Sequence, residues 1–327
     1  MTPLSAVYGG VARFRRSWYE RRPAARTHLA RPVISVGNLV VGGSGKTPVV
    51  AAIASTLTRL GHRPAILSRG YGRTSRSSDV VVVSEGMGPL VSVHESGDEP
   101  QMLARDLASV PIVVSADRSR AGVMAIERFN PTVLILDDGF QHLRLQRTID
   151  LLVMAAADLN ERLLPAGRLR EPLSAARTAD AVLVYGDADN ARRVASGAGV
   201  PRSFFVTRQA LPMRPFSESG TTPPATARVV AVAGIARPER FFETLRRTHE
   251  IGREVVFGDH HWFTDADVRE IEQHARALGV DAIVTTAKDG VRLSPHRAAM
   301  SLPWAILPIE VSIEPAAEFE SWLRQRL

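Results

Sequence analysis

The clearest chemical signal in the chain is the run Gly42-Gly43-Ser44-Gly45-Lys46-Thr47. Glycines let successive backbone N–H groups turn toward a phosphate, a lysine ammonium can reach the β- and γ-phosphates of a nucleotide, and a threonine hydroxyl can bind magnesium. The β-branched run 33–36 precedes this segment and a helical pattern through Leu60 follows it, which is the strand–loop–helix order that such a loop needs. Val40 stands where the usual motif begins with glycine, so Gly42 and Gly43 have to supply the flexibility. The sequence therefore predicts a phosphate loop that binds ATP and Mg²⁺.

Two adjacent aspartates, Asp137 and Asp138, follow the apolar run 133–136, and Gln141 comes shortly after them. Ligands bind at the carboxyl ends of strands in open α/β sheets. Adjacent carboxylates repel each other unless a cation lies near them, so this pair predicts a magnesium site beside the phosphate loop. A solvated turn that holds two acids is the alternative.

Asp98 stands in the run Gly97-Asp98-Glu99-Pro100, directly before a helical pattern. A carboxylate there could accept the proton of an attacking hydroxyl, but an acid at this position can also simply cap the helix. The run Asp259-His260-His261 could join the same site only if two domains face each other, and by itself such a pair is more often structural. Lys46 and Lys288 are the only lysines among the 41 Lys and Arg residues, which suggests that both positions need a compact ammonium group. No chemical role for Lys288 follows from the sequence.

The elements that would position these residues follow an α/β pattern. Short apolar runs alternate with helical patterns from Pro32 to about residue 184, as in a buried, mostly parallel sheet flanked by helices. Proline, glycine and serine accumulate over 211–227, as in a linker, and a shorter alternation follows. The sequence predicts an NTPase-like phosphate-loop core over 31–215, a second, smaller α/β domain over 216–327, and an N-terminal amphipathic helix within 1–30.

A helical pattern near the amino terminus combines an apolar stripe with several arginines. The stripe consists of Leu4, Val7, Tyr8, Val11, Phe14 and Trp18. This pattern is typical of a helix that lies in a membrane interface, where each nearby basic residue adds about 1 kcal/mol of attraction to anionic lipid. Arg15 lies close to the stripe and would have to extend its charged end into water. A helix packed on the protein's own core is the alternative.

Composition narrows the classes of function. The chain of 327 residues has no cysteine, which excludes disulfides, thiolate nucleophiles and cysteine-based metal sites. Its apolar runs are far shorter than the roughly 20 residues of a spanning helix, and none follows the amino-terminal arginines as in a secretory signal, so we expect a cytoplasmic protein. The net charge of +7 favours an anionic partner, but no basic stripe interleaved with aromatic residues indicates nucleic acid.

In their order along the chain, these motifs resemble those of the tetraacyldisaccharide 4′-kinases of lipid A biosynthesis. The matching segments are 35–38, 42–48, Ser68-Arg69-Gly70-Tyr71-Gly72-Arg73, 97–101, 116–118, 137–142, Leu164-Pro165-Ala166-Gly167-Arg168-Leu169-Arg170-Glu171-Pro172, 232–235, 259–260 and Thr286-Ala287-Lys288-Asp289. The resemblance implies that ATP with Mg²⁺ is the phosphate donor and that an acylated glucosamine disaccharide 1-phosphate is the acceptor. It also implies that the 4′-phosphorylated lipid A precursor, lipid IVA, is the product, and that the protein attaches peripherally to the cytoplasmic face of the inner membrane.

The resemblance also assigns residues to roles. It implies that Asp98 is the catalytic base, assisted by His260, and that Lys46 stabilises charge on the transferred phosphate. The nucleotide-binding residues that it implies are the loop Gly42–Thr47, Gln141, Arg118 and Arg170. The candidate metal ligands are Thr47, Asp137, Asp138 and Glu171, and which of the acids binds the metal directly stays open.

Two other functions fit the same phosphate loop. A soluble ATP-dependent synthetase or ligase would gain nothing from lipid or detergent. A membrane-associated regulatory ATPase would hydrolyse nucleotide without forming a phosphorylated product.

Overall fold

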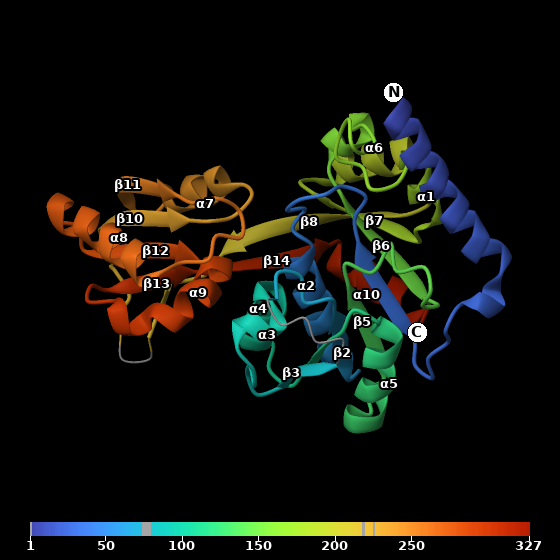
Figure 1. Cartoon of the computed structure of the whole chain (residues 1–327), viewed down its shortest axis with the longest axis horizontal. Coiled ribbons are helices and arrows are strands. Elements are labelled where there is room, and N and C mark those ends of the chain that lie inside the picture. The colour runs from blue at the N-terminus through green and yellow to red at the C-terminus, as the bar shows by residue number, and fades with distance from the viewer. Residues whose placement is uncertain (1, 74–79, 218–219, 225) are drawn as a thin grey trace. The chain divides into compact units, whose positions relative to one another are not determined.

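The computed structural model describes residues 2–73, 80–217, 220–224 and 226–327. They form two compact units (Figure 1). The first unit comprises Met1–Arg208 together with Val311–Leu327, and the second comprises Gln209–Glu310. Each unit has its own sheet and its own core, and each is described by itself.

A nine-stranded sheet forms the centre of the first unit, in the order β14-β8-β7-β6-β1-β5-β2-β4-β3. Its strands are β1 (Val33–Gly37), β2 (Pro64–Ser68), β3 (Val81–Glu85), β4 (Pro111–Val114), β5 (Val133–Asp137), β6 (Ile149–Met154), β7 (Ala181–Tyr185), β8 (Ser203–Ala210) and β14 (Ile309–Glu314). Neighbouring strands from β8 to β4 pair in parallel, and β3 pairs antiparallel with β4 at the edge. The predicted, mostly parallel sheet is confirmed.

Helices cover both faces of this sheet. The helices of the first unit are α1 (Pro3–Arg21), α2 (Lys46–Arg59), α3 (Val93–Ser96), α4 (Asp98–Asp106), α5 (Arg118–Phe129), α6 (Ala188–Ala198) and α10 (Ala316–Arg324), with short 3₁₀ helices η1 (Pro23–Ala25), η2 (Ala156–Asn160) and η3 (Leu173–Thr178). Successive strand residues point to opposite faces. Ile34 therefore packs with α2, α4 and α10, whereas Val33 packs with α5. Because both faces are covered, the strands appear in the sequence as continuous apolar runs.

A five-stranded sheet forms the second unit, in the order β11-β10-β12-β13-β9. Its strands are β9 (Arg214–Pro215), β10 (Arg228–Ala233), β11 (Glu250–Val256), β12 (Ala282–Thr286) and β13 (Trp304–Leu307), and its helices are α7 (Pro238–Leu245), α8 (Asp265–Leu278), α9 (Ala287–Leu293) and the 3₁₀ helix η4 (Ser294–Ala299). Strands β11 to β13 pair in parallel, and β9 pairs antiparallel with β13. The expected smaller α/β unit is present.

The second unit differs in extent from the expected 216–327. Strand β9 already pairs with β13, so the chain joins the second sheet before residue 216. After Glu310 the chain returns to the first sheet, because Val311 lies in the core of the first unit and the rings of Phe319 and Trp322 pack on Phe204. Residues 311–327 therefore belong to the first unit. Of the expected linker, residues 218–219 and 225 lie outside the described residues.

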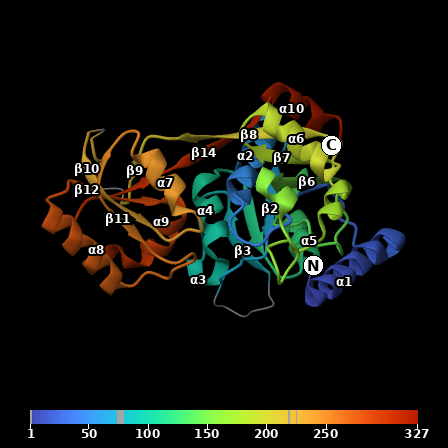
Figure 2. The same ribbon diagram turned by 90° about the horizontal axis from the view of Figure 1, so that it is seen from above.

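The expected amino-terminal helix forms over Pro3–Arg21 and lies on the outside of the first unit in both views (Figures 1 and 2). Its buried face consists of Ser5, Gly9 and Arg16. The apolar stripe points outward, with Leu4, Val7, Val11 and Phe14 between 63% and 71% exposed. Across the part of the chain that the structure describes, no helix combines the length and the hydropathy needed to cross a membrane.

Candidate active site

The central parallel strands β1, β5, β2 and β4 are neighbours in the first sheet, so their carboxyl ends lie along the same edge. The phosphate loop follows β1, and the acidic pair lies at the end of β5. Arg69 follows β2, and Arg118 follows β4 after a short loop. Since this edge is where open α/β sheets bind ligands, the strand order gathers the predicted site residues of the first unit at one place.

Left-handed backbone at two glycines shapes the phosphate loop. Gly42 has φ +99°, and Gly45, with φ +79°, directly precedes Lys46 at the start of α2. Val40, which stands where the usual motif has glycine, is buried and forms an isolated bridge with Leu169. The prediction named Gly42 and Gly43 as the flexible positions, and of these two Gly42 has a positive φ.

Two residues that the sequence did not single out contact this loop. The Tyr185 hydroxyl donates to the Gly45 carbonyl at 2.8 Å, and the Arg208 guanidinium lies 3.7 Å above the Tyr185 ring. A Cβ at position 45 would lie 2.8 Å from the Tyr185 hydroxyl oxygen and 2.9 Å from an Arg208 nitrogen. The φ angle favours glycine at position 45, and a larger residue there would also have to displace the ends of the Tyr185 and Arg208 side chains. Tyr185 and Arg208 carry no local motif, and only the strand order brings them to the loop.

Lys46 faces the acidic pair from the phosphate loop. Its Nζ donates to Asn38 Oδ1 at 3.0 Å and to Ser44 Oγ at 3.3 Å, and it lies 3.4 Å from Asp138 Oδ1. Asp138 Oδ2 accepts from Arg170 Nη1 at 2.8 Å. Burial acts to raise the pKa of Asp138, but the charges of Lys46 and Arg170 outweigh burial and lower it. Asp138 is therefore an ionised carboxylate held between two cations.

Asp137 is only 1% exposed and has one carboxylate oxygen without a partner. Its Oδ2 accepts from Ser68 Oγ at 3.2 Å, whereas its buried Oδ1 accepts no hydrogen bond from the residues that the structure describes. Burial, together with the charges of Glu99 and Asp138, raises the pKa of Asp137 to about 7. A buried carboxylate oxygen in this state is costly unless it carries a proton or meets a cation.

The described residues contain no group of three or more acidic or histidine side chains that could hold a metal ion by themselves. Mg²⁺ does not need such a group, because it usually binds one or two carboxylates and completes its octahedron with water and substrate phosphates. Thr47, at the second position of α2, is buried in the same loop.

Asp98 is the first residue of α4 and is 4% exposed. Its Oδ1 accepts from the backbone N–H of Glu99 at 2.9 Å, and the N-cap position itself is taken by Gly97. A Cβ at Gly97 would lie 2.5 Å from the Tyr71 carbonyl oxygen, so the start of α4 packs on the segment that follows β2. The fold thus brings the predicted base to the same edge of the sheet as the phosphate loop.

Arg118 and Gln141 lie in the same region. Arg118 is buried at the start of α5, and burial, followed by the charge of Arg69, lowers its pKa to about 10. The charges of Asp138 and Asp137 act on its pKa in the opposite direction. Gln141 Nε2 donates to the Asn38 carbonyl at 2.9 Å, and thereby connects the acidic segment to the end of β1.

Glu171 does not join these acids. Arg16 of α1 donates to both of its carboxylate oxygens, at 2.7 Å to Oε2 and 3.0 Å to Oε1, and both residues are buried. The structure therefore engages Glu171 with an arginine instead of grouping it with Asp137 and Asp138 into a three-acid cluster. The sequence showed no sign of this pair, whose members are 155 positions apart.

His260 belongs to the second unit and has a left-handed backbone with φ +61°. Its Nε2 lies 3.3 Å from Lys288 Nζ and 3.9 Å from Asp259 Oδ2. Arg292 Nη1 donates to the carbonyls of Gly234 and His261, each at 3.1 Å, and so fixes the loop that carries His260. Lys288, which the sequence left without a role, thus contacts the predicted catalytic histidine.

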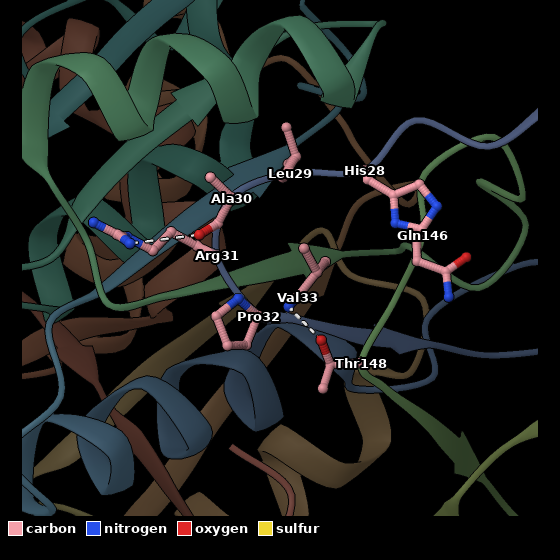
Figure 3. Close-up of a pocket in the computed structure, with 8 residues that line it drawn as sticks. All are labelled: His28, Leu29, Ala30, Arg31, Pro32, Val33, Gln146 and Thr148. Carbon is pink, nitrogen blue, oxygen red and sulfur yellow. Dashed lines mark hydrogen bonds between the residues drawn. The ribbon is translucent and has the colours of Figure 1, made fainter. Parts of the chain in front are cut away.

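A pocket lies at the amino end of β1 (Figure 3). Its lining residues are His28, Leu29, Ala30, Arg31, Pro32, Val33, Gln146 and Thr148. The Val33 N–H in its wall donates to Thr148 Oγ1 at 3.1 Å. Val33 begins β1, whereas the phosphate loop follows the last residue of the strand, so this pocket is separate from the site described above.

Comparisons with known proteins agree with this geometry. A family model described as tetraacyldisaccharide-1-P 4′-kinase matches residues 1–327. The tetraacyldisaccharide 4′-kinase of Geobacter sulfurreducens is 41% identical over 319 residues, which cover 95% of this chain and 89% of that protein. The protein of the same name from Pelobacter propionicus is 40% identical over 334 residues, which cover 100% of this chain and 92% of that protein.

Among solved structures, the crystal structure of an "apo" form of LpxK from Aquifex aeolicus in complex with ATP is similar to this chain, with a TM-score of 0.77 and 31% sequence identity. The similarity covers 99% of this chain and 97% of that one. Because the family model matches the whole length of the chain and relatives of this name are about 40% identical to it, this chain belongs to the tetraacyldisaccharide-1-P 4′-kinase family.

Proposed function

We propose that this chain transfers the γ-phosphate of ATP to the 4′-hydroxyl of tetraacyldisaccharide 1-phosphate and forms the 4′-phosphorylated lipid A precursor. The observation that carries the proposal is the contact of the phosphate-loop Lys46 with Asp138 at the ligand-binding edge of the sheet, in a chain that matches this kinase family throughout. The ATP complex of the Aquifex aeolicus relative supports ATP as the donor.

A transfer assay tests the proposal. The chain is incubated with labelled ATP, Mg²⁺ and the acylated glucosamine disaccharide 1-phosphate in mixed micelles, and the lipid is separated and counted. We expect label on the lipid, and no label when the 4′-hydroxyl of the acceptor is blocked. Release of phosphate without labelled lipid would instead favour a regulatory ATPase, and transfer to a soluble acceptor would favour a synthetase or ligase.

The residues of the loop hold the nucleotide in this proposal. The backbone N–H groups of 42–47 and the Lys46 ammonium bind its phosphates, while Thr47 and Asp137 would hold Mg²⁺ directly. Asp138, whose two oxygens contact Lys46 and Arg170, would act on the ion through its negative charge. Bound Mg²⁺ supplies positive charge that neutralises the charge developing on the phosphoryl oxygens. The unpartnered, buried Oδ1 of Asp137 supports this ligand set. We leave Glu171 out of it, because Arg16 engages both of its oxygens.

Asp98 accepts the proton of the 4′-hydroxyl as that oxygen attacks the γ-phosphorus in line with the leaving group. Its burial, and the packing of the α4 start on the segment that follows β2, support this role. His260 assists Asp98, as the family resemblance implies. Most of the rate enhancement then comes from positioning and from preorganised charge.

Lys288 positions His260 in this proposal. An ammonium group only donates, so Lys288 Nζ, 3.3 Å from Nε2 of His260, binds the tautomer whose ring proton is on Nδ1. We expect Lys288→Met to lower kcat roughly tenfold, as for other weakened acid–base assistance. The KM for ATP should not change, because the nucleotide binds the first unit. Steady-state kinetics measure both values, and Lys288→Arg, which retains a donor, should recover most of kcat. Wild-type kcat in Lys288→Met would contradict this role.

The outward face of α1 is proposed to bind the membrane surface. Its apolar side chains Leu4, Val7, Val11 and Phe14 are exposed, while the opposite face packs on the first unit. An exposed apolar stripe beside arginines is suited to shallow insertion into an anionic leaflet.

Charged substitutions on this face test the membrane proposal. We expect the double variant Val7→Glu with Val11→Glu to reduce binding to anionic vesicles about tenfold, because it places two carboxylates in the membrane interface. The fold should persist, since both side chains are largely exposed. Vesicle sedimentation measures the effect, and Val123→Glu, at a 45% exposed position of α5, is the matched control. If the double variant and the control sediment alike, the proposal fails.

A further inference from the structure

Arg16 connects α1 to the interior of the first unit through a buried set of contacts. Its guanidinium binds both carboxylate oxygens of Glu171, at 2.7 and 3.0 Å, and donates to Thr178 Oγ1 at 3.0 Å. It also lies 4.4 Å from the centroid of the Phe140 ring. Arg16, Glu171 and Phe140 are all buried. One side chain from the amino-terminal helix therefore holds two segments that lie far away in the sequence.

Phe140, whose ring Arg16 contacts, belongs to the chain segment that carries Asp138. Its Cβ and backbone N pack so closely on Gly37 that a Cβ at position 37 would approach them to 2.5 and 2.8 Å. Gly37 ends β1, just before the phosphate-loop segment. The ring under Arg16 is thus fixed between the acidic segment and the strand that leads into the loop.

Glu171, the ion-pair partner of Arg16, directly follows Arg170. Arg170 Nη1 donates to Asp138 Oδ2 at 2.8 Å, and its backbone N–H donates to the Leu39 carbonyl at 2.7 Å. By holding Glu171, Arg16 holds the chain segment from which Arg170 reaches Asp138. The two segments that contribute Asp138 and its arginine partner are therefore joined to the same guanidinium.

Two more hydrogen bonds from α1 reach the same two segments of the chain. The Tyr8 hydroxyl donates to the Arg170 carbonyl at 2.9 Å, and Arg15 Nη2 donates to the Gln141 carbonyl at 3.1 Å. The sequence predicted that Arg15 extends its charged end into water. In the structure, this exposed side chain instead hydrogen bonds to the acidic segment. The buried and the exposed contacts of α1 converge on the acidic segment and on 170–171.

We propose that Arg16 is a positioning residue of the phosphotransfer site, which holds the segments 138–141 and 170–171 in register so that Asp138, Gln141 and Arg170 meet the phosphate loop. A buried ion pair contributes little net stability compared with apolar side chains of similar volume, so the role inferred for this pair is to fix the geometry of the site. The proposal rests on the proposed function in so far as nucleotide binds at the phosphate loop. In this proposal, the inward face of α1 positions residues of the nucleotide site, and its outward face binds the membrane.

The test uses the double variant Arg16→Met with Glu171→Met in the full chain, because Arg16→Met alone leaves an unpaired buried carboxylate and could fail to fold. Calorimetric titration with a non-hydrolysable ATP analogue gives the stoichiometry, which reports the folded fraction, and Kd, which reports the geometry of the site. We expect near wild-type stoichiometry and melting temperature, a Kd raised about tenfold and a kcat lowered up to about a hundredfold, because small misplacements of site residues have effects of this size. Arg13→Met removes an exposed arginine from the same helix and should keep the wild-type Kd.

The titrations are made with Mg²⁺ and with EDTA, since a positioning role weakens nucleotide binding in both media. A loss confined to the Mg²⁺ medium would make Glu171 a metal ligand and overturn the proposal. Wild-type Kd and kcat in the double variant would overturn it too, as would a loss of stoichiometry and melting temperature at unchanged Kd, which describes a structural role only. If the wild-type chain binds the analogue but labels no lipid, the proposed function fails, and the comparison of Kd values still decides the role of Arg16.

Discussion

Replacing Asp98 with asparagine is expected to lower kcat by about 10²- to 10⁴-fold, the range typical of a lost general base. Asparagine keeps the shape of the side chain and an oxygen that can accept the Glu99 N–H bond, so the start of α4 should stay in place. The affinity for ATP should remain close to the wild-type value, because the phosphates are bound by the loop after β1. Single-turnover kinetics with saturating ATP and lipid measure the chemical step directly.

The matched control for this prediction is Asp106→Asn, which makes the same change at the exposed last residue of α4. It should leave both kcat and nucleotide affinity unchanged. A variant Asp98→Asn that turns over at the wild-type rate would remove Asp98 from the chemistry. A variant that instead loses nucleotide affinity would show that Asp98 acts on the site of the donor and not on the acceptor.

Asp137→Asn is expected to have opposite effects on activity and on stability. Turnover should fall about a hundredfold or more, because one of the proposed metal ligands is lost and metal ions supply several kcal/mol of charge stabilisation in such reactions. The nucleotide-free protein should become more stable at neutral pH. In the folded protein, burial raises the pKa of Asp137 from its ordinary 3.8 to about 7. Strained or unsatisfied groups that reduce stability are a common cost of active sites.

The pH dependence of this gain follows from linkage. Between pH 4 and pH 7 the carboxyl of Asp137 stays protonated in the folded chain but ionises in the unfolded chain. Its contribution to the free energy of unfolding is therefore fully present below the unfolded pKa and is lost as pH rises through the folded pKa. Asparagine cannot ionise in either state. The excess melting temperature of Asp137→Asn over wild type should therefore grow from pH 4 to pH 7 and then level off, when measured without metal or nucleotide. A constant difference across this range would mean that Asp137 is ionised throughout.

Much of the fold could be predicted from the sequence, because its signals are local. A β-branched run followed by glycines, a lysine and a helix predicts a phosphate loop whatever the rest of the chain does. Continuous apolar runs separated by helical patterns predict a buried parallel sheet, and the stripe from Leu4 to Phe14 predicts an amphipathic α1. These elements formed as expected, and so did the second, smaller α/β unit.

The end of the second unit could not be predicted in the same way. The alternation of strands and helices continues smoothly through residue 327, and nothing in its period says to which sheet a strand belongs. In the folded chain, β14 lies beside β8 in the first sheet, and Phe319 and Trp322 of α10 pack on Phe204, so both elements complete the first unit.

By itself, therefore, the sequence determined the types of the elements and the residues whose chemistry is carried by a contiguous motif, such as Lys46 with Thr47 or Asp137 with Asp138. The tertiary structure decided which distant side chains meet: Arg16 with Glu171, Tyr185 with Gly45, and Lys288 with His260. The physical reason is that backbone propensities and hydrophobic periods act over a few residues, whereas these contacts arise from strand order and helix packing. Strand order and helix packing depend on the burial of side chains across the whole chain.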